Sequence, residues 1–402
     1  MKSADPTRRS FLQRLLLFSL LGLLSSKTGD TRAFASRNSD GKMRDVRKKG
    51  KTAVVRVHSS AVIREQLASQ FTREPFNADE LNAMVSEGMK TLTTRNDLRD
   101  AWMNVLVHYN RGDKIAIKPN FNFVNMETDH AVTSPQLINS VVGQLVEVVG
   151  VAPGDIYLYD LCKKIPLNVR NAIHYPISFV ERTDAATVID KIRQRLHTGP
   201  ASADRNAEII MREKIADAAG DPVRCYLPHV VSEAQHLINM PLLTSHPFIA
   251  NSGALKNHFG TVRFSNYNSY PEMLHGGVLT KSIVDINANE QIKNKTRLVI
   301  GDGLFGVFDR GNGEEKKKWT TFHDDFPKSI FLSRDPVAID TVMANIIIHE
   351  RKQHHLGALP AEYLRDAEAR GLGVCELQEG GDAYARIDYR TISLQGSVPG
   401  GV

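Results

Sequence analysis

The chain has 402 residues, of which 42% are apolar and 24% are charged, a globular composition that excludes a wholly disordered or collagen-like protein. Its formal charge is +6, but the first 52 residues hold 13 Lys and Arg against 4 Asp, so residues 53–402 carry a net charge of −3. A slightly acidic folded body argues against nucleic acid as a partner.

The first 35 residues are predicted to be a signal peptide. Arg8-Arg9-Ser10-Phe11-Leu12 precedes an apolar run at 15–24, and Ala33-Phe34-Ala35 follows as a small-residue cleavage site. The run is about half of the ~20 residues that a membrane-spanning helix needs, so a retained anchor is the less favoured alternative. The paired arginines resemble the twin-arginine export motif, which implies the twin-arginine translocase as a partner and a periplasmic location.

Residues 36–52 are polar and basic, with almost nothing apolar to bury, and are predicted to be a flexible linker. Residues 53–402 then form the predicted α/β domain. Its cysteines, Cys162, Cys225 and Cys375, lie far apart without a CxxC spacing. No iron–sulfur cluster is therefore expected.

Short β-rich runs alternate with helical periods along this domain. The predicted strands are 53–57, 114–118, 155–159, 236–239, 297–300 and 329–332, and the predicted helices are 80–91, 135–149, 185–196, 208–219, 281–291 and 336–350. Ser134-Pro135 and Asp335-Pro336 each combine an N-cap side chain with proline at the first helical position. The alternation predicts an α/β fold with a mostly parallel sheet and crossover helices on both faces. Residues 178–222 are interpreted as a lid or insertion, or equally as a plain surface excursion.

The segment after strand 236–239 carries the clearest chemical signal. His246, Ser252-Gly253, Lys256 and His258 follow a strand end, where ligands sit in open α/β sheets. The Ser252-Gly253 amides can receive negative charge, Lys256 can clamp an anion, and His246 can serve as acid, base or metal ligand. The alternative is a structural histidine and a solvated lysine.

Other strand ends add further candidates. Lys118 and Asn120 could line a pocket or form a simple exit turn. Asp302 is expected on a turn after the strand, where it could orient a histidine or cap the turn. Asp160 and Asp340, with His246, could form a mixed carboxylate–imidazole metal site, although strand-end acids are common in α/β proteins.

Four ordered motifs resemble the domain of unknown function 362 family. They are Ile117-Lys118-Pro119-Asn120, the central stretch from Asn239 to Gly260, Ile300-Gly301-Asp302-Gly303 and Leu332-Ser333-Arg334-Asp335-Pro336-Val337-Ala338-Ile339-Asp340. Family members commonly carry lysines just before the motif histidine, whereas this chain has Leu242-Leu243-Thr244-Ser245. The resemblance implies an α/β fold but no substrate. Some members append a Cys-rich ferredoxin-like segment, which this sequence does not contain.

A more distant similarity connects His246, Ser252-Gly253, Lys256 and Gly260 with the N-terminal domain of the nickel-pincer lactate racemase family. That similarity implies that Lys256 anchors an organometallic cofactor and that His246 exchanges the substrate proton. It is a likeness at the level of the fold.

The preferred hypothesis is an exported, cofactor- or metal-dependent enzyme that acts on a small polar molecule by proton transfer or redox. The alternative is a periplasmic ligand- or metal-binding or maturation protein without catalysis. The catalytic candidates are His246, Lys256 and Asp302; the cofactor-binding candidates are Lys118, Asn120, Ser252, Gly253, Lys256 and Asn257; and the metal candidates are His246, Asp160 and Asp340.

Overall fold

The computed structural model describes residues 51–63, 76–121, 132–181, 199–217, 219–265, 271–310, 317–378 and 383–394. The predicted signal peptide, almost all of the predicted linker and the predicted helix 185–196 lie outside these ranges. No helix in these ranges is long and apolar enough to cross a membrane.

The described residues build a nine-stranded, mostly parallel sheet in the order β14-β1-β13-β12-β9-β2-β3-β4, with β10 paired to β12. β13 is antiparallel to both β1 and β12, and the other pairings along the sheet are parallel. The strands are β1 (Thr52–Ser59), β2 (Ile115–Pro119), β3 (Ile156–Asp160), β4 (Ser178–Glu181), β9 (His236–Met240), β10 (Leu242–Thr244), β12 (Thr296–Val307), β13 (Ser329–Ser333) and β14 (Ile387–Leu394). The predicted fold class is confirmed.

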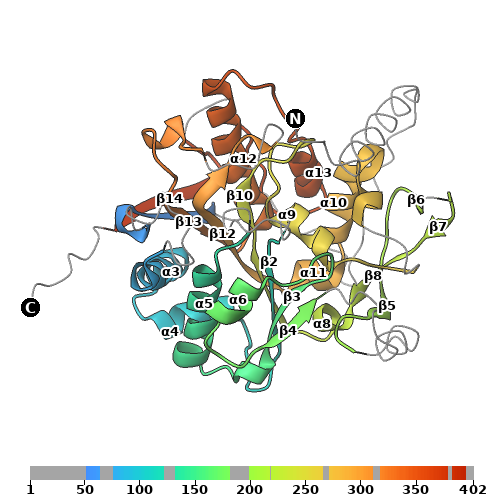
Figure 1. The fold of residues 1–402 in the computed structure, drawn as a ribbon, viewed down its shortest axis with the longest axis horizontal. Coiled ribbons are helices and arrows are strands. Elements are labelled where there is room, and N and C mark those ends of the chain that lie inside the picture. The colour runs from blue at the N-terminus through green and yellow to red at the C-terminus, as the bar shows by residue number, and fades with distance from the viewer. Residues whose placement is uncertain are drawn as a thin grey trace, which may run out of the picture.

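Helices cover both faces of this sheet (Figure 1). The group on one face is α3 (Ala78–Thr93), α4 (Leu98–Val105), α5 (Pro135–Gln144) and α6 (Leu167–Ala172). The other face carries α9 (Ala254–Asn257), α10 (Leu279–Asn287), α11 (Glu290–Lys295), α12 (Pro336–Gln353) and α13 (Tyr363–Ala369). α5 continues as a π-helical turn, Leu145–Val149. The predicted caps are confirmed, because the Ser134 side chain accepts from Leu137 N and the Asp335 side chain accepts from Val337 N and Ala338 N.

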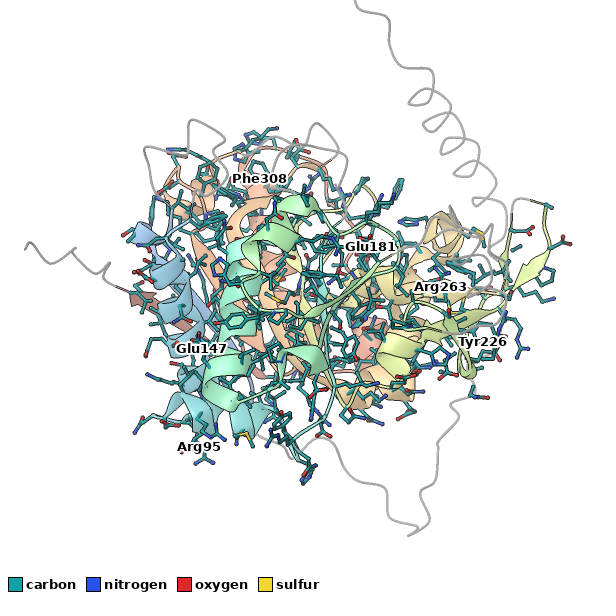
Figure 2. The ribbon with its side chains drawn as sticks, turned by 60° about the horizontal axis from the view of Figure 1, so that its bottom comes forward. Arg95, Glu147, Glu181, Tyr226, Arg263 and Phe308 are labelled. Atoms are coloured by element: carbon teal, nitrogen blue, oxygen red, sulfur yellow. The ribbon has the colours of Figure 1, made fainter. Side chains whose placement is uncertain are left out.

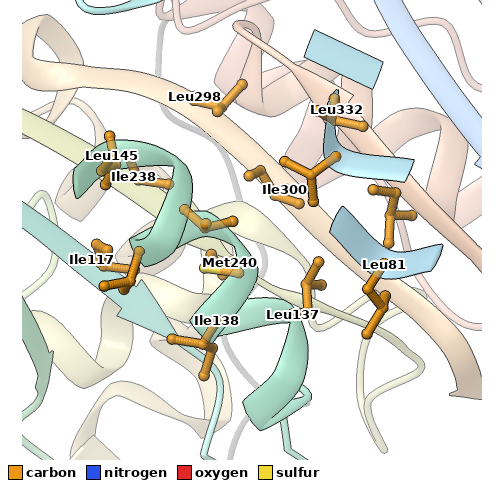
Figure 3. Packing of buried hydrophobic residues seen from close by; sticks show 14 of the residues in the cluster. Leu81, Ile117, Leu137, Ile138, Leu145, Ile238, Met240, Leu298, Ile300 and Leu332 are labelled. Carbon is orange, nitrogen blue, oxygen red and sulfur yellow. The ribbon is translucent and has the colours of Figure 1, made fainter. Parts of the chain in front are cut away.

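Successive side chains of a strand point to opposite faces of the sheet, so neighbouring residues pack into different hydrophobic cores. In β12, Leu298 and Ile300 face the core under α3 and α5, whereas Val299 faces the core under α12. Figure 3 shows Leu137, Ile138 and Leu145 packed over the strand residues of the first core. The sheet is therefore buried on both faces, as its nearly continuous apolar strands require.

Smaller sheets lie beside the main one. β5 (Ala203–Ile209), β8 (Cys225–Pro228) and β11 (Arg263–Phe264) form an antiparallel sheet next to α8 (His229–Ser232), and β6 (Ile215–Ala216) pairs with β7 (Pro222–Val223). Tyr226 and Arg263 mark the three-stranded sheet in Figure 2, at the opposite end of the molecule from Arg95. Within the stretch 178–222, β4 joins the main sheet and β5 the smaller one.

Three local predictions were wrong. The segment 208–219 is not a helix, because Glu208 and Ile209 pair with β8 and the following residues begin a hairpin with β7. The segment 281–291 is divided between α10 and α11. Gly301-Asp302-Gly303 is not a turn, since β12 continues through it and pairs with β13.

Candidate functional site

Lys118 forms a buried ion pair at the carboxyl end of the sheet. β2 and β3 are parallel neighbours, so Lys118 and Asp160 lie at the same edge, with Lys118 Nζ 2.9 Å from Asp160 Oδ2 and the side chains 2% and 5% exposed. The ammonium also donates to Pro119 O at 2.7 Å and to Asn257 Oδ1 at 3.3 Å. Three acceptors thus satisfy its three protons. Lys118 is a structural residue in this arrangement.

The remaining polar side chains nearby hold α9 against the strand ends. Asn257 donates to Lys118 O at 3.0 Å and to Asn239 Oδ1 at 2.8 Å, and Asn239 donates to Ala254 O at 2.8 Å. Gly260 allows this packing, because a Cβ there would lie 2.7 Å from Lys118 Cε. Asn257 therefore belongs to a hydrogen-bond network that links the ends of β2 and β9 to α9.

Asn120 belongs to the turn that leaves β2. The backbone N–H of Asn120 donates to Thr133 Oγ1 at 2.8 Å, and Thr133 N donates to the backbone carbonyl of Asn120 at 2.9 Å. The Thr133 hydroxyl in turn donates to Met240 O at 2.8 Å. These contacts match the alternative interpretation of this segment, an exit turn.

Asp340 reaches from α12 to the start of α9. Its carboxylate accepts from Ala254 N at 2.6 Å and from Leu255 N at 2.9 Å. Burial raises the pKa of Asp340 to about 7, against the opposing effect of these hydrogen bonds. Gly253 backs onto this carboxylate so closely that a Cβ would overlap it, and Ser252 N donates to Thr244 O at 2.8 Å. The amide of Ser252 is therefore already engaged, contrary to its predicted role in receiving negative charge.

Asp302 does not orient His246. Its two oxygens accept from Ser134 N, the cap of α5, at 2.7 Å and from Leu304 N at 3.0 Å. Burial raises the pKa of Asp302 to about 6. The carboxyl borders a small cavity lined by Phe76, Val132, Ser134, Leu242, Asp302, Phe305 and Gly306.

His246 and Lys256 are connected by a continuous set of ring contacts. We call the set formed by His246, His275, Phe259 and Lys256 the ring row. His246 stacks on His275 with ring centroids 5.6 Å apart, His275 meets the edge of Phe259 at 5.4 Å, and Lys256 Nζ lies 3.8 Å from the Phe259 ring centroid. On its other side His246 contacts Phe248 at 5.7 Å. An ammonium above an aromatic face is a favourable cation–π arrangement.

The electrostatic environment of the ring row is cationic. Burial and then the charges of Lys256, Arg310 and His275 lower the pKa of His246 far below its usual range. Arg310 is held beside this loop, since its backbone amide donates to Ser245 Oγ at 3.0 Å. The imidazole is therefore neutral at physiological pH and lies in a field that attracts anions.

His258 is 1% exposed and is not part of the ring row. Burial, together with the charge of Lys118, lowers the pKa of His258 to about 3. Its Nδ1 pairs with Thr261 Oγ1 at 3.0 Å, and Thr261 also contacts the Tyr159 hydroxyl at 3.1 Å. His258 is a neutral structural histidine.

The predicted metal set is not supported by these contacts. Across the described ranges, no three His, Cys, Asp or Glu side chains gather into a group that could hold a metal ion. Asp160 is paired with Lys118, Asp340 binds the start of α9, and His246 lies among cationic groups that disfavour a metal ion.

The residues predicted to hold a cofactor do not fit the nickel organometallic group that the racemase likeness implies. Lys118 and Asn257 bind each other, and Gly253 is closed off by Asp340. The Lys256 ammonium lies against the Phe259 ring. The described residues at these positions form packed structure instead.

Sequence reasoning missed three members of the site, His275, Phe259 and Arg310. His275 stands in Leu274-His275-Gly276-Gly277, a pair of glycines after a histidine, which is a weak local signal. Arg310 follows β12 by a few residues, and nothing in its neighbourhood marks it. The pairing of β10 with β12 brings Arg310 to the His246 loop. The contact between the turns His258–Thr261 and Pro271–Leu274 brings His275 to Phe259.

Comparisons with known proteins place the chain in a family. No curated protein sequence matches it significantly. Among solved structures, the lactate racemase apoprotein from Thermoanaerobacterium thermosaccharolyticum is distantly similar, with 10% identity and a TM-score of 0.35 over 77% of this chain. The alignment spans 59% of that racemase chain. A family profile described as "Domain of unknown function (DUF362)" matches residues 115–345, more than half of the chain, and the chain therefore belongs to the DUF362 family.

Proposed function

We propose that this protein binds a small carboxylate at the ring row and that the imidazole of His246 or His275 transfers a proton to or from it. The observation that carries this proposal is the convergence of Lys256, Arg310 and the two imidazoles, of which Lys256 and His246 are buried and Arg310 and His275 are partly exposed. A carboxylate would pair with ammonium and guanidinium groups there, where exclusion of water strengthens the attraction.

Proton transfer is the reaction that the imidazoles support. His246 is neutral, and its Nδ1 accepts from Phe248 N at 3.3 Å, so the neutral ring carries its proton on Nε2. It can donate that proton as an acid, or accept one at Nδ1 when the bond to Phe248 N is released. An anion bound near Lys256 offsets the positive charge that lowers the pKa of His246, which brings the imidazole closer to a useful base. Binding and base strength are thus coupled at this site.

The alternative function is a ligand carrier without catalysis. The low pKa of His246 favours it, since a strongly depressed imidazole is a weak base. The two functions share the same anion site and differ only in whether a bond to hydrogen is broken.

Calorimetric titration with acetate and lactate, against their neutral amides, tests the anion site. Lys256→Met should lower carboxylate affinity at least tenfold, whereas Lys256→Arg and the exposed control Lys352→Met should retain it. Incubation of lactate in D₂O, followed by NMR of the carbon next to the carboxyl group, tests proton transfer. Exchange that depends on His246 supports the enzyme, and binding without exchange supports the carrier. Absence of any carboxylate binding contradicts both.

We also propose a location and a domain plan. Residues 1–35 direct export through the twin-arginine translocase, residues 36–52 form a flexible linker, and residues 53–402 form the periplasmic domain. The Arg8-Arg9-Ser10-Phe11-Leu12 motif before an apolar run supports it. Joint replacement Arg8→Lys and Arg9→Lys should leave the precursor in the cytoplasm on cell fractionation. Unchanged export of that variant would contradict the twin-arginine route.

A further inference from the structure

The two edges of the main sheet differ in length. One edge is β4, with four residues, and the other is β14, with eight, on the side of the sheet away from β4 (Figure 1). Natural sheets commonly protect an exposed edge with a very short strand, a proline, lysines or a bulge. β4 is short, whereas β14 contains neither proline nor lysine and pairs with β1 in unbroken register over all eight residues. The edge formed by β14 is therefore suited to pairing with a further strand.

The backbone groups of β14 alternate between its two sides. In a parallel ladder, the N–H and C=O of every second residue point to the same neighbouring strand. Thr52 N donates to Arg386 O at 3.1 Å, so the even-numbered residues of β14 face β1. The odd-numbered residues face away, and accordingly Ile387 N donates to Glu376 Oε2 at 3.1 Å rather than to β1.

The second half of β14 presents this outer side to solvent. The backbone groups of Thr391 and Ser393 point away from β1 by the same alternation, and both residues are exposed. Among the strands of the described ranges, none pairs with this side of β14. Buried or solvated, such a row of donors and acceptors is a template for another extended chain.

The charged side chains of β14 are engaged within the chain. The Arg390 guanidinium donates to Thr91 O at 2.9 Å and to Asp388 Oδ2 at 2.9 Å. Arg386, just before the strand, pairs with Glu368. These ion pairs limit the repulsion that would keep a second β14 strand away.

The sequence of this half is complementary to itself. When two identical strands pair antiparallel about a two-fold axis at Ile392, Thr391 lies opposite the partner's Ser393, and Ile392 lies opposite its own copy. Each Thr–Ser pair exchanges both N–H···O bonds, because these residues face outward. Cross-strand Thr–Ser and β-branched pairs stabilise such a ladder. An axis at Arg390 would instead place two guanidinium groups opposite each other.

We propose that β14 pairs with the β14 strand of a second copy of this chain, edge to edge and antiparallel, with Ile392 at the two-fold axis. The two main sheets then continue into one another. The pairing is closed, because each copy uses the same edge and β4 is too short to extend the sheet further. The recognition chemistry is a backbone hydrogen-bond ladder supported by the Thr–Ser and Ile–Ile pairs.

Sedimentation velocity of the purified protein tests the pairing. The wild type should sediment as a dimer that dissociates on dilution. Thr391→Pro removes one outward N–H from each copy but no hydrogen bond to β1, so the dissociation constant should rise roughly tenfold or more. Thr391→Val keeps the N–H and favours extended backbone, so it should retain the dimer.

Cysteine cross-linking gives a second measurement that does not require the proline variant to fold. In the proposed dimer Ile392 and its copy form a non-hydrogen-bonded pair with Cα atoms ~4.5 Å apart, within reach of a disulfide. Oxidation of Ile392→Cys should therefore yield a covalent dimer on a non-reducing gel. Ser393→Cys, which lies opposite the partner's Thr391, is the matched control and should cross-link much less, as should the wild type.

The outcomes decide the proposal in each case. A wild-type protein that sediments as a monomer overturns it, and so does an unchanged dissociation constant for Thr391→Pro in a variant with unchanged circular dichroism. If Thr391→Pro does not fold, the cysteine variants decide. Absence of cross-linking in Ile392→Cys, or equal cross-linking in Ser393→Cys, then overturns the proposed arrangement.

Discussion

Lys118 and Lys256 lie in two different motifs of the DUF362 family and are both largely buried, yet their surroundings differ. Lys118 has a carboxylate partner, a backbone carbonyl and an amide oxygen. Lys256 lies against an aromatic ring in the company of Arg310 and two histidines. The comparison teaches that the neighbours of a buried lysine, rather than its residue type, decide whether its ammonium is paired with a carboxylate or lies against an aromatic ring.

Removal of the Asp160 carboxylate, the counter-charge of Lys118, should produce the largest loss of stability. Asp160→Asn leaves the Lys118 ammonium buried without a counter-charge and should lower the free energy of unfolding by about 3–5 kcal/mol in urea denaturation. The matched surface change Glu233→Gln breaks an ion pair whose side chains are 38% and 52% exposed and should cost less than about 1 kcal/mol.

Adding Lys118→Met to Asp160→Asn should restore much of the lost stability, because no unpaired charge remains. A stability loss from Asp160→Asn no greater than that from Glu233→Gln would break the comparison.

The free energy of unfolding should depend on pH through Asp302, a buried carboxylate whose hydrogen-bond partners are backbone amides. Burial raises the pKa of Asp302 from 3.8 to about 6, so the folded state binds its proton more tightly than the unfolded state. Its stabilising contribution is full below about pH 4 and should be lost as pH rises through 6, a change of ~3 kcal/mol at 1.36 kcal/mol per pKa unit. Denaturation of wild type and Asp302→Asn at several pH values measures this.

The expected signature is a difference between the two proteins that changes with pH in that window. A pH-independent difference for Asp302→Asn would mean that the carboxyl has the same proton affinity in both states.

Crowding of the Lys118–Asp160 ion pair by a new side chain at Gly260 should lower the free energy of unfolding by an intermediate amount. In Gly260→Ala the new Cβ would lie 2.8 Å from Lys118 Nζ and 3.1 Å from Asp160 Oδ2, so the pair must shift. We expect a loss of about 1–3 kcal/mol. Gly154→Ala, where a Cβ meets nothing within 4 Å, is the control. Equal tolerance of both alanines would show that the pair moves freely.

The smallest effect on the free energy of unfolding is expected from substitution of Lys256. Lys256→Met removes a charge that opposes protonation of His246 and retains a thioether contact with Phe259, so the free energy of unfolding should change by less than about 1 kcal/mol. The pKa of His246 should rise, which an NMR titration detects. A loss as large as that of Asp160→Asn would erase the distinction between the two lysines.

The sheet could be predicted because its signals are local. All six predicted strands exist, since β-branched runs bounded by turns leave little choice, and the Ser134 and Asp335 caps mark their helices. The segment 208–219 was mistaken for a helix because its polar residues favour one, whereas pairing with β8 is a tertiary contact.

The site was less predictable for a related reason. His246 and Lys256 could be identified from their place after a strand, but the role of Asp302 depended on a turn that is instead a continuous strand. His275 and Arg310 enter through contacts between distant segments, which no spacing in the sequence encodes. Likewise, nothing local distinguishes Lys118 from Lys256, because the compensating Asp160 comes from a different strand.

The position of β1 has a consequence for folding. This first strand of the described chain lies between β13 and β14, and its register with β14 runs from Thr52↔Ile387 to Ser59↔Leu394. β13 begins only at Ser329 and β14 only at Ile387, so both neighbours come from segments far along the chain from β1. This side of the sheet therefore closes through contacts of large sequence separation, which form late in folding.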